Sequence, residues 1–231
     1  MPTAVQKYAD VSYEEKERLF LQVKADPRYE HYLYGCYECG ICVASCPSAR
    51  FYDFSPRRIA QTMSREDVET FYEILVEDIW NCSQCFSCNR CPRHNSPGGI
   101  VTIMREVAVR NGLESAKEAL EGYGRVIYKI ISMGTQVSPD MLQVDAFPDW
   151  GPDVRAVAEN LEVWRKAIPP ETLHTTNTAW RVDQKTITEL YLIWHMTGVL
   201  EMIREVDASL HDILNEIMED TLMEHGYVLE G

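Results

Sequence analysis

The sequence has no cysteine outside two short stretches and no apolar run long enough to cross a membrane. Its most apolar window, "ELYLIWHMTGVLEMI", is interrupted by Glu189, His195 and Glu201, whereas a membrane span requires about 20 mostly apolar residues. The first residues also lack the basic start and the apolar run of a secretory signal. We therefore expect a cytoplasmic protein without direct membrane insertion.

Basic residues are scarce in the second part of the chain. Residues 1–134 hold 16 Lys/Arg and 18 Asp/Glu, a net charge of -2, whereas residues 135–231 hold 6 and 18, a net charge of -12. Such an acidic segment repels phosphate backbones, so no nucleic-acid partner is expected. The acidity serves either solubility or the docking of a partner, and the composition leaves both open.

Strand signals are almost absent, and the apolar periodicity is helical. It predicts helices at about 12–26, 55–63, 64–80, 100–112, 114–120, 125–133, 153–167, 183–204 and 208–225. Ser55 is expected to cap a helix that begins at Pro56, and Ser64 with Asp67 resembles a capping box. The Gly-, Pro- and Asp-rich stretch 134–152 suggests a boundary. We expect a cysteine-containing domain at 1–134 and an acidic helical extension at 135–231 that docks a partner.

The cysteines form two similar runs, "CYECGICVASCP" and "CSQCFSCNRCP". They are Cys36, Cys39, Cys42, Cys46, Cys82, Cys85, Cys88 and Cys91. The first run matches C-x2-C-x2-C-x3-C-P, the spacing of [4Fe-4S] ligands in two-cluster ferredoxins, where the fourth cysteine ligates the other cluster. On that pattern one cluster takes Cys36, Cys39, Cys42 and Cys91. The second takes Cys82, Cys85, Cys88 and Cys46.

The second run departs from the pattern, because two residues separate Cys88 from Cys91 where three are expected. This leaves the cross-assignment of Cys91 less firmly supported than that of Cys46. Pro47 and Pro92 each follow a fourth cysteine and help the chain turn away from it. Two [4Fe-4S] clusters are thus the expected cofactors.

Disulfides and zinc are the alternatives for these thiols. Disulfides suit small secreted domains, and this chain has no signal segment and is long enough to fold without covalent bridges. Two zinc sites would require pairs of CxxC separated by a loop, not four cysteines in one run that ends in proline.

A few other residues near these runs have open roles. Arg57 and Arg58 either stabilise the negative charge of reduced clusters or pair with nearby carboxylates. His94 is expected at the surface or as a capping residue, and His195 as a packing residue. Trp80 is expected to shield a cluster from water, because solvent exposure affects its reduction potential.

The order "CYECGICVASCP", "SPRRIA", "IWNCSQCFSCNRCPR" and then a helix with Arg105 resembles the C subunit of heterodisulfide reductase and of the heterodisulfide-reductase-like complexes of sulfur-oxidising microbes. The resemblance covers about residues 30–125. It implies an α-helical ferredoxin fold, so the expected fold class is mainly α, an α-helical ferredoxin domain with two [4Fe-4S] clusters followed by a helical acidic extension.

The resemblance also implies a function without catalysis of its own. Such a protein relays single electrons between a flavin- and iron–sulfur-containing subunit of the A type and a catalytic subunit of the B type, which contains CCG motifs. This chain has no adjacent cysteine pair, so it resembles the relay. The iron–sulfur subunit of a flavin-dependent dehydrogenase of the succinate, fumarate or glycolate type, and a structural metal-binding assembly module, are the competing interpretations.

Overall fold

The computed structural model describes residues 11–134, 156, 159–167 and 182–224. The chain divides into two compact units, Met1–Ala116 and Lys117–Gly231, here called the N-terminal and C-terminal units. The described part is helical and contains no strand, which confirms the predicted fold class. None of the described helices is long and apolar enough to cross a bilayer.

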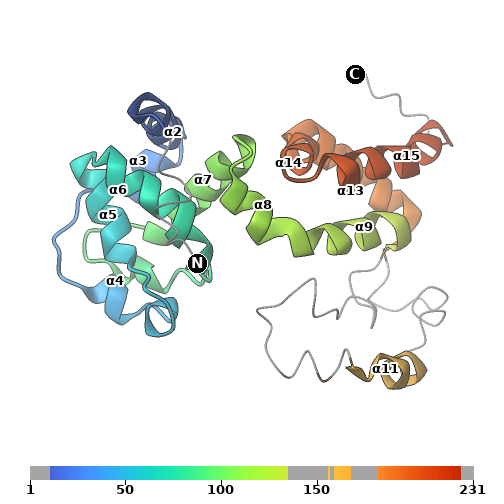
Figure 1. The fold of residues 1–231 in the computed structure, drawn as a ribbon, viewed down its shortest axis with the longest axis horizontal. Coiled ribbons are helices and arrows are strands. Elements are labelled where there is room, and N and C mark those ends of the chain that lie inside the picture. The colour runs from blue at the N-terminus through green and yellow to red at the C-terminus, as the bar shows by residue number, and fades with distance from the viewer. Residues whose placement is uncertain (1–10, 135–155, 157–158, 168–181, 225–231) are drawn as a thin grey trace. The chain divides into compact units, whose positions relative to one another are not determined.

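Short helices dominate the N-terminal unit (Figure 1). Its elements are α2 (Tyr13–Ala25), α3 (Tyr29–Tyr32), α4 (Ile41–Ala44), η1 (Ser48–Arg50), α5 (Pro56–Arg65), α6 (Val68–Glu73), the π-helical turn η2 (Ile74–Asp78), η3 (Ile79–Asn81), η4 (Ser87–Arg90) and α7 (Pro97–Arg110). Helix α8 (Glu114–Leu120) runs across the division between the units along the chain.

Helix α7 is the central packing element of the N-terminal unit. Its Ile100, Val101 and Ile103 side chains are fully buried, and α2, α3 and α5 each pack against it. Helix α2 also packs on α6, where the Phe20 and Phe71 rings meet edge to face with centroids 5.2 Å apart. Apolar burial of this kind is the main favourable term in folding. It gives the two cysteine runs a common support.

Sequence-encoded caps set the start of the helices beside the first cysteine run. The Ser55 hydroxyl accepts a hydrogen bond from the Arg58 amide, and Pro56 opens α5, as predicted. The predicted start of the next helix at Ser64 is wrong. Helix α5 continues to Arg65, Glu66 takes the left-handed conformation, and Asp67 caps α6 by accepting from Thr70 N. A short acidic side chain three residues further on thus sets the boundary.

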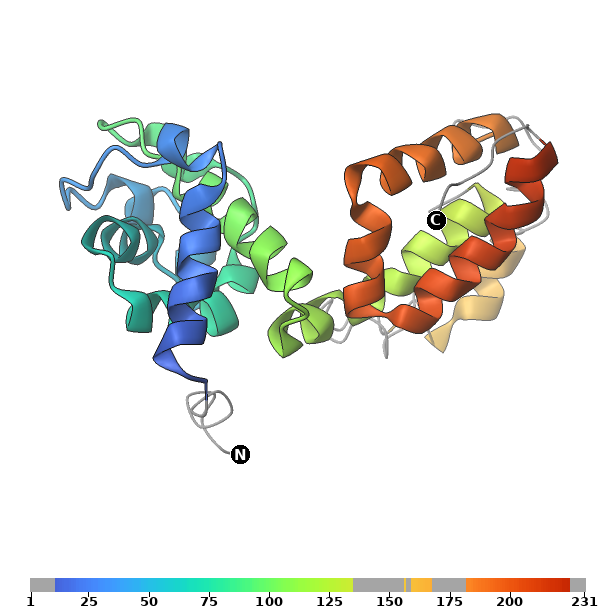
Figure 2. The ribbon, with the colours of Figure 1, turned by 90° about the horizontal axis from the view of Figure 1, so that it is seen from above.

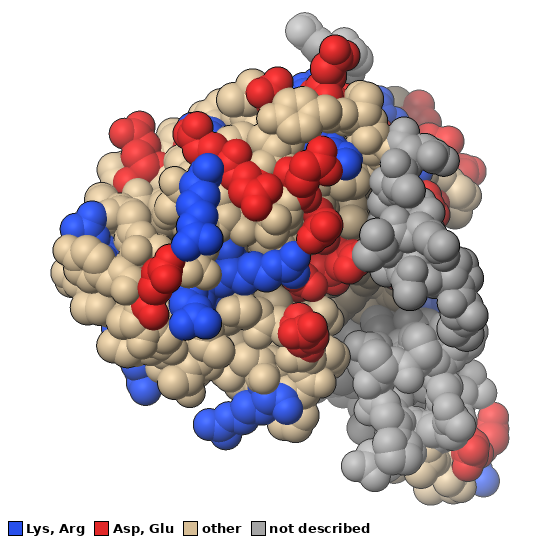
Figure 3. All heavy atoms as spheres, turned by 60° about the vertical axis from the view of Figure 1, so that its left-hand side comes forward, with Lys and Arg blue, Asp and Glu red and all other residues tan. Residues whose placement is uncertain are grey.

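Ion pairs lie on the surface of the N-terminal unit. Lys16 pairs with Glu69 at 2.6 Å, and Lys24 pairs with Glu66. Figure 3 shows basic and acidic side chains interspersed over one face of the molecule. Exposed pairs of this kind contribute about 0–1 kcal/mol each. They favour solubility more than they hold the fold.

The C-terminal unit has its own apolar core. Its described elements are η5 (Glu121–Tyr123), α9 (Gly124–Met133), α11 (Leu161–Ala167), α13 (Gln184–Thr197), α14 (Val199–Val206) and α15 (Ala208–Glu224). Figure 2 shows α9 and α15 lying side by side, and the two helices pack together. Ile131 of α9 joins Tyr191 and Leu214 in one buried cluster. The unit therefore begins before the domain boundary expected at 134/135, and most of the stretch 134–152 lies outside the described residues.

The predicted helix over 183–204 is two helices. Gly198 takes a φ of 78°, ends α13 and begins α14. A left-handed residue interrupts the helical hydrogen bonds, and glycine adopts that conformation without a steric penalty. Ile187 of α13 and Ile203 of α14 are buried, and so is Leu214 of α15, whereas Ile213 of α15 is 41% exposed.

Candidate metal centre

The two cysteine runs share one backbone design. In the first, Glu38 and Gly40 have φ values of 59° and 78°. In the second, Gln84 and Phe86, at the same distances from the first cysteine, have φ values of 53° and 56°. Left-handed residues turn the chain sharply, and they are uncommon for residues other than glycine. The first three cysteines of each run are therefore arranged around a tight double turn.

The shorter spacing of the second run has a structural explanation. Helix α4, an α-helical turn, carries Cys42 and ends at Ala44, two residues before Cys46, whereas the 3-10 turn η4 carries Cys88 and ends at Arg90, directly before Cys91. An α-helix rises about 1.5 Å per residue and a 3-10 helix about 2.0 Å. A 3-10 turn therefore covers the same axial distance with fewer residues than an α-helical turn. The missing residue is thus compensated by a tighter turn.

The cysteines line two cavities, and each cavity draws its fourth thiol from the other run. Cavity 1 is defined by Cys36, Cys39, Cys42 and Cys91. Cavity 2 is defined by Cys46, Cys82, Cys85 and Cys88. Helices α4 and η4, which carry Cys42 and Cys88, pack against each other, and Pro97 lines both cavities. The structure thus brings together the same two quartets that the spacing predicts.

Backbone N–H groups lie close to the thiols of both cavities. The Gly98 amide lies 3.3 Å from Cys88 Sγ, and the Glu38 amide lies 3.4 Å from Cys36 Sγ. Such N–H groups stabilise the charge on cluster sulfurs.

Burial shapes the thiols' ionisation. It raises the pKa of Cys42 and Cys82, and it raises the pKa of Cys88 to about 11. A hydrogen bond with Ser87 lowers the pKa of the exposed Cys85. A thiol with a raised pKa stays protonated at neutral pH, whereas bound iron stabilises the thiolate form. Cluster binding should therefore release protons from the buried thiols.

Residues of the link after the second run hold the first run in place. Asn95, 1% exposed, accepts a hydrogen bond from Tyr34 N at 2.6 Å and donates to Gly35 O at 2.7 Å. The Ser96 amide donates to Tyr32 O at 2.9 Å. These bonds fix the chain that enters Cys36 against the start of α7. The sequence alone did not identify them, because they connect segments about 60 residues apart.

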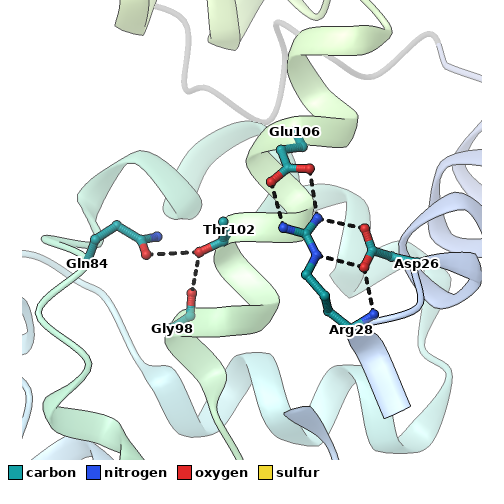
Figure 4. Close-up of polar contacts among 6 residues, drawn as sticks. All are labelled: Asp26, Arg28, Gln84, Gly98, Thr102 and Glu106. Carbon is teal, nitrogen blue, oxygen red and sulfur yellow. Dashed lines mark hydrogen bonds and ion pairs between the residues drawn. The ribbon is translucent and has the colours of Figure 1, made fainter. Parts of the chain in front are cut away.

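Polar side chains of α7 position the second run. Arg105 donates to the carbonyl oxygens of Ile79 and Cys82 and lies over the Trp80 ring at 5.0 Å. The Thr102 hydroxyl lies 3.0 Å from Gln84 Oε1 and 3.1 Å from the carbonyl oxygen of Gly98 (Figure 4). Trp80 does not line either cavity, so the expected shielding of a cluster by its ring is not seen.

An ion-pair network connects α7 to the end of α2. The Arg28 guanidinium donates to both carboxylate oxygens of Asp26 and to both of Glu106, at 2.7 to 2.9 Å (Figure 4). These partners raise the pKa of Arg28 above its ordinary value. Bidentate geometry of this kind is directional. It therefore helps to fix the angle at which α2 meets α7.

The two arginines that sequence analysis left open have different roles. Arg57 lines cavity 1, whereas Arg58 pairs with Glu73 at 2.8 Å and Asp78 at 3.0 Å. Arg93 also lines cavity 1, and no local sequence signal identified it. His94 is exposed and lines neither cavity, in agreement with its expected surface position.

Comparisons with known proteins identify the cysteine region. Residues 32–95 match the 4Fe-4S dicluster domain. The chain is 46% identical over 85 residues to the C subunit of ferredoxin:CoB-CoM heterodisulfide reductase of Methanosarcina acetivorans. The aligned segment covers 36% of this chain and 33% of that protein. It is 34% identical over 80 residues to the iron-sulfur C 2 subunit of CoB–CoM heterodisulfide reductase of Methanocaldococcus jannaschii, 33% of this chain and 40% of that protein.

A third relative is the C subunit of the ferredoxin/F(420)H(2)-dependent CoB-CoM heterodisulfide reductase of Methanosarcina acetivorans, 35% identical over 82 residues, which is 35% of this chain and 49% of that protein. The match thus spans at most about half the length of these relatives. The predicted resemblance to the C subunit is confirmed for the cysteine region. The dicluster domain and the eight cysteines fit two [4Fe-4S] clusters, as predicted.

Proposed function

We propose that this chain is the electron-transfer subunit of a cytoplasmic heterodisulfide-reductase-like complex. The observation that carries the proposal is the division of all eight cysteines into two quartets around neighbouring cavities. No cysteine is left over for a nucleophile. When bound, the clusters supply reversible one-electron transfer. The protein then positions them and limits their contact with water.

We assign Cys36, Cys39, Cys42 and Cys91 to one cluster and Cys82, Cys85, Cys88 and Cys46 to the other. The composition of the cavity linings supports this assignment. Cys46 and Cys88 are each only 7% exposed, whereas Cys39 and Cys85 are exposed. Each cavity thus has one thiol at the surface, where a partner could exchange electrons. The elements that carry Cys42 and Cys88 pack against each other, which keeps the two sites adjacent.

The partners follow from the names of the relatives, which are subunits of heterodisulfide reductases. A protein of this type implies other subunits. We propose a flavin- and iron–sulfur-containing subunit on one side and a catalytic subunit with CCG motifs on the other. Sulfur oxidation or disulfide metabolism is the proposed process, and the acidic C-terminal unit is the proposed docking element.

Anaerobic purification of the full chain tests the proposal. We expect about eight iron and eight sulfide per chain, and potentiometric EPR should resolve two one-electron steps. Zinc in place of iron would refute the proposal. Clusters that show no redox response in the intact complex would favour a structural assembly module instead.

Co-purification from the source cells tests the partners separately. We expect a CCG-containing protein and a flavoprotein to be retained by the tagged chain. A flavoprotein retained without any CCG-containing partner would favour the iron–sulfur subunit of a flavin-dependent dehydrogenase.

A further inference from the structure

The two cavities differ in charge. Arg57 and Arg93 line cavity 1 together with its four cysteines. The residues other than cysteine that line cavity 2 are uncharged. They are Ser48, Phe54, Pro56, Ser83, Phe86, Pro97 and Gly98. Two sites with the same ligands and nearly the same backbone therefore have different electrostatic surroundings.

Arg93 is held at cavity 1 by groups that leave its charge uncompensated. Its guanidinium donates to the carbonyl oxygen of Tyr34, lies over the Tyr37 ring at 4.7 Å and donates to the Tyr37 hydroxyl at 2.9 Å. Carbonyl and aromatic partners fix the position of a cation without adding a negative charge. In the described part of the chain, no carboxylate forms an ion pair with Arg93.

Arg57 is similar in this respect. It forms no ion pair with a carboxylate of the described residues, whereas its neighbour Arg58 binds two. Glu38, in the loop between Cys36 and Cys39, carries the negative charge that acts on Arg57. It pairs with Arg65 at 2.6 Å, so a second cation offsets that charge. The surroundings of cavity 1 are therefore net positive.

We propose that Arg57 and Arg93 give the cluster of cavity 1 the higher reduction potential, so that each electron passes from the cluster of cavity 2 to the cluster of cavity 1. This inference rests on the proposed function. Reduction adds one negative charge to a cluster, and nearby cations stabilise that charge. In each transfer the cluster of cavity 2 is oxidised by one electron and the cluster of cavity 1 is reduced by one.

The difference in burial between the thiols of the two cavities also favours the higher reduction potential at cavity 1. Cavity 2 contains the two most buried thiols, Cys46 and Cys88, whereas all four thiols of cavity 1 are at least partly exposed. Low solvent exposure disfavours added negative charge. The cluster of cavity 2 is therefore the electron donor on both grounds.

Two features would raise the reduction potential of the cluster of cavity 2 instead. The charge of Arg105 acts on Cys82, but Arg105 binds backbone carbonyl oxygens, stacks on Trp80 and does not line cavity 2. Hydrogen bonds with Ser87 reach Cys85, an exposed thiol at which water supplies comparable bonds. One cation outside the cavity lining and one exposed hydroxyl are weaker than two full charges at the cavity wall.

Potentiometric EPR on the full cluster-loaded chain tests the proposal, with Arg57→Gln, Arg93→Gln and the control Arg58→Gln. Each variant removes one charge, but Arg58 lies outside both cavities. We expect the higher-potential step to fall in the first two variants, with at least a tenfold lower reduced-to-oxidised ratio at fixed potential, which is about 59 mV for one electron. The lower step should move less, and Arg58→Gln should move neither.

Arg93→Lys separates charge from structure. Lysine keeps the charge but loses the fork that binds Tyr34 O, so most of the potential should be retained if charge is the cause. An unchanged higher step in Arg57→Gln and Arg93→Gln, or a larger shift of the lower step, would overturn the inference while two working clusters still support the proposed function. Absence of any redox step in the unsubstituted chain would refute the proposed function itself.

Discussion

Crossed ligation, in which each run supplies one cysteine to the cluster of the other run, can be tested by counting iron in paired cysteine substitutions. In the structure Cys46 shares a cavity with Cys82 and not with Cys36, its neighbour along the chain. Each quartet would hold four iron ions, so Cys46→Ala should lower the iron content from about eight to about four per chain. Alanine has no ligand atom, which removes the ambiguity of serine.

The iron content of two double variants distinguishes crossed ligation from local ligation. If Cys46 and Cys82 serve the same cluster, Cys46→Ala with Cys82→Ala loses no more than either single change and keeps about four iron. Cys46→Ala with Cys36→Ala should lose both clusters and retain almost none. Iron and sulfide analysis after anaerobic purification measures both values.

The opposite pattern would refute the reasoning. Local ligation, in which each run holds its own cluster, predicts almost no iron in the Cys46/Cys82 variant and about four in the Cys46/Cys36 variant. Cluster loss also costs folding free energy, so a substitution that destabilises the whole unit lowers the iron content further. EPR of the residual cluster covers that case, because the spectrum of Cys46→Ala should match that of Cys82→Ala and differ from that of Cys36→Ala.

Three further predictions concern the scaffold. Gly99→Ala should destabilise the protein by about 1 kcal/mol in urea unfolding, because an added Cβ would lie 2.7 Å from the Tyr32 ring and overpacking outweighs the gain in helix propensity. Burial raises the pKa of Tyr191 to about 12 from an ordinary 10, so its contribution to stability is complete below pH 10 and is lost as the pH rises towards 12. Tyr191→Phe should remove this pH dependence and leave the Asn215 side-chain oxygen without its hydrogen-bond donor. An unchanged alkaline unfolding profile in this variant would contradict the prediction. Arg28→Gln should cost about 1 kcal/mol in low salt and less in about 1 M salt, because its partners are partly exposed; equal losses at both salt concentrations would count against an ionic cause.

Several features of the scaffold were predictable from short segments. The helical class follows from apolar periodicity, and the caps at Ser55 and Pro56 follow from local hydrogen bonding and a fixed φ. The break at Gly198 was missed, because glycine inside a periodic segment is compatible both with a continuous helix and with a left-handed end. Packing of α14 against α15 decides between them.

The cluster chemistry could be predicted from the order of residues alone, because eight thiols at metal-ligand spacing are a local and recognisable pattern. Two outcomes became visible only in the folded chain. They are how a run that is one residue shorter still fits, and that Arg57 and Arg93, unlike Arg58, lie at a cavity wall. These outcomes depend on contacts between segments far apart along the chain. Such contacts follow from the packing around α7, which no local pattern encodes.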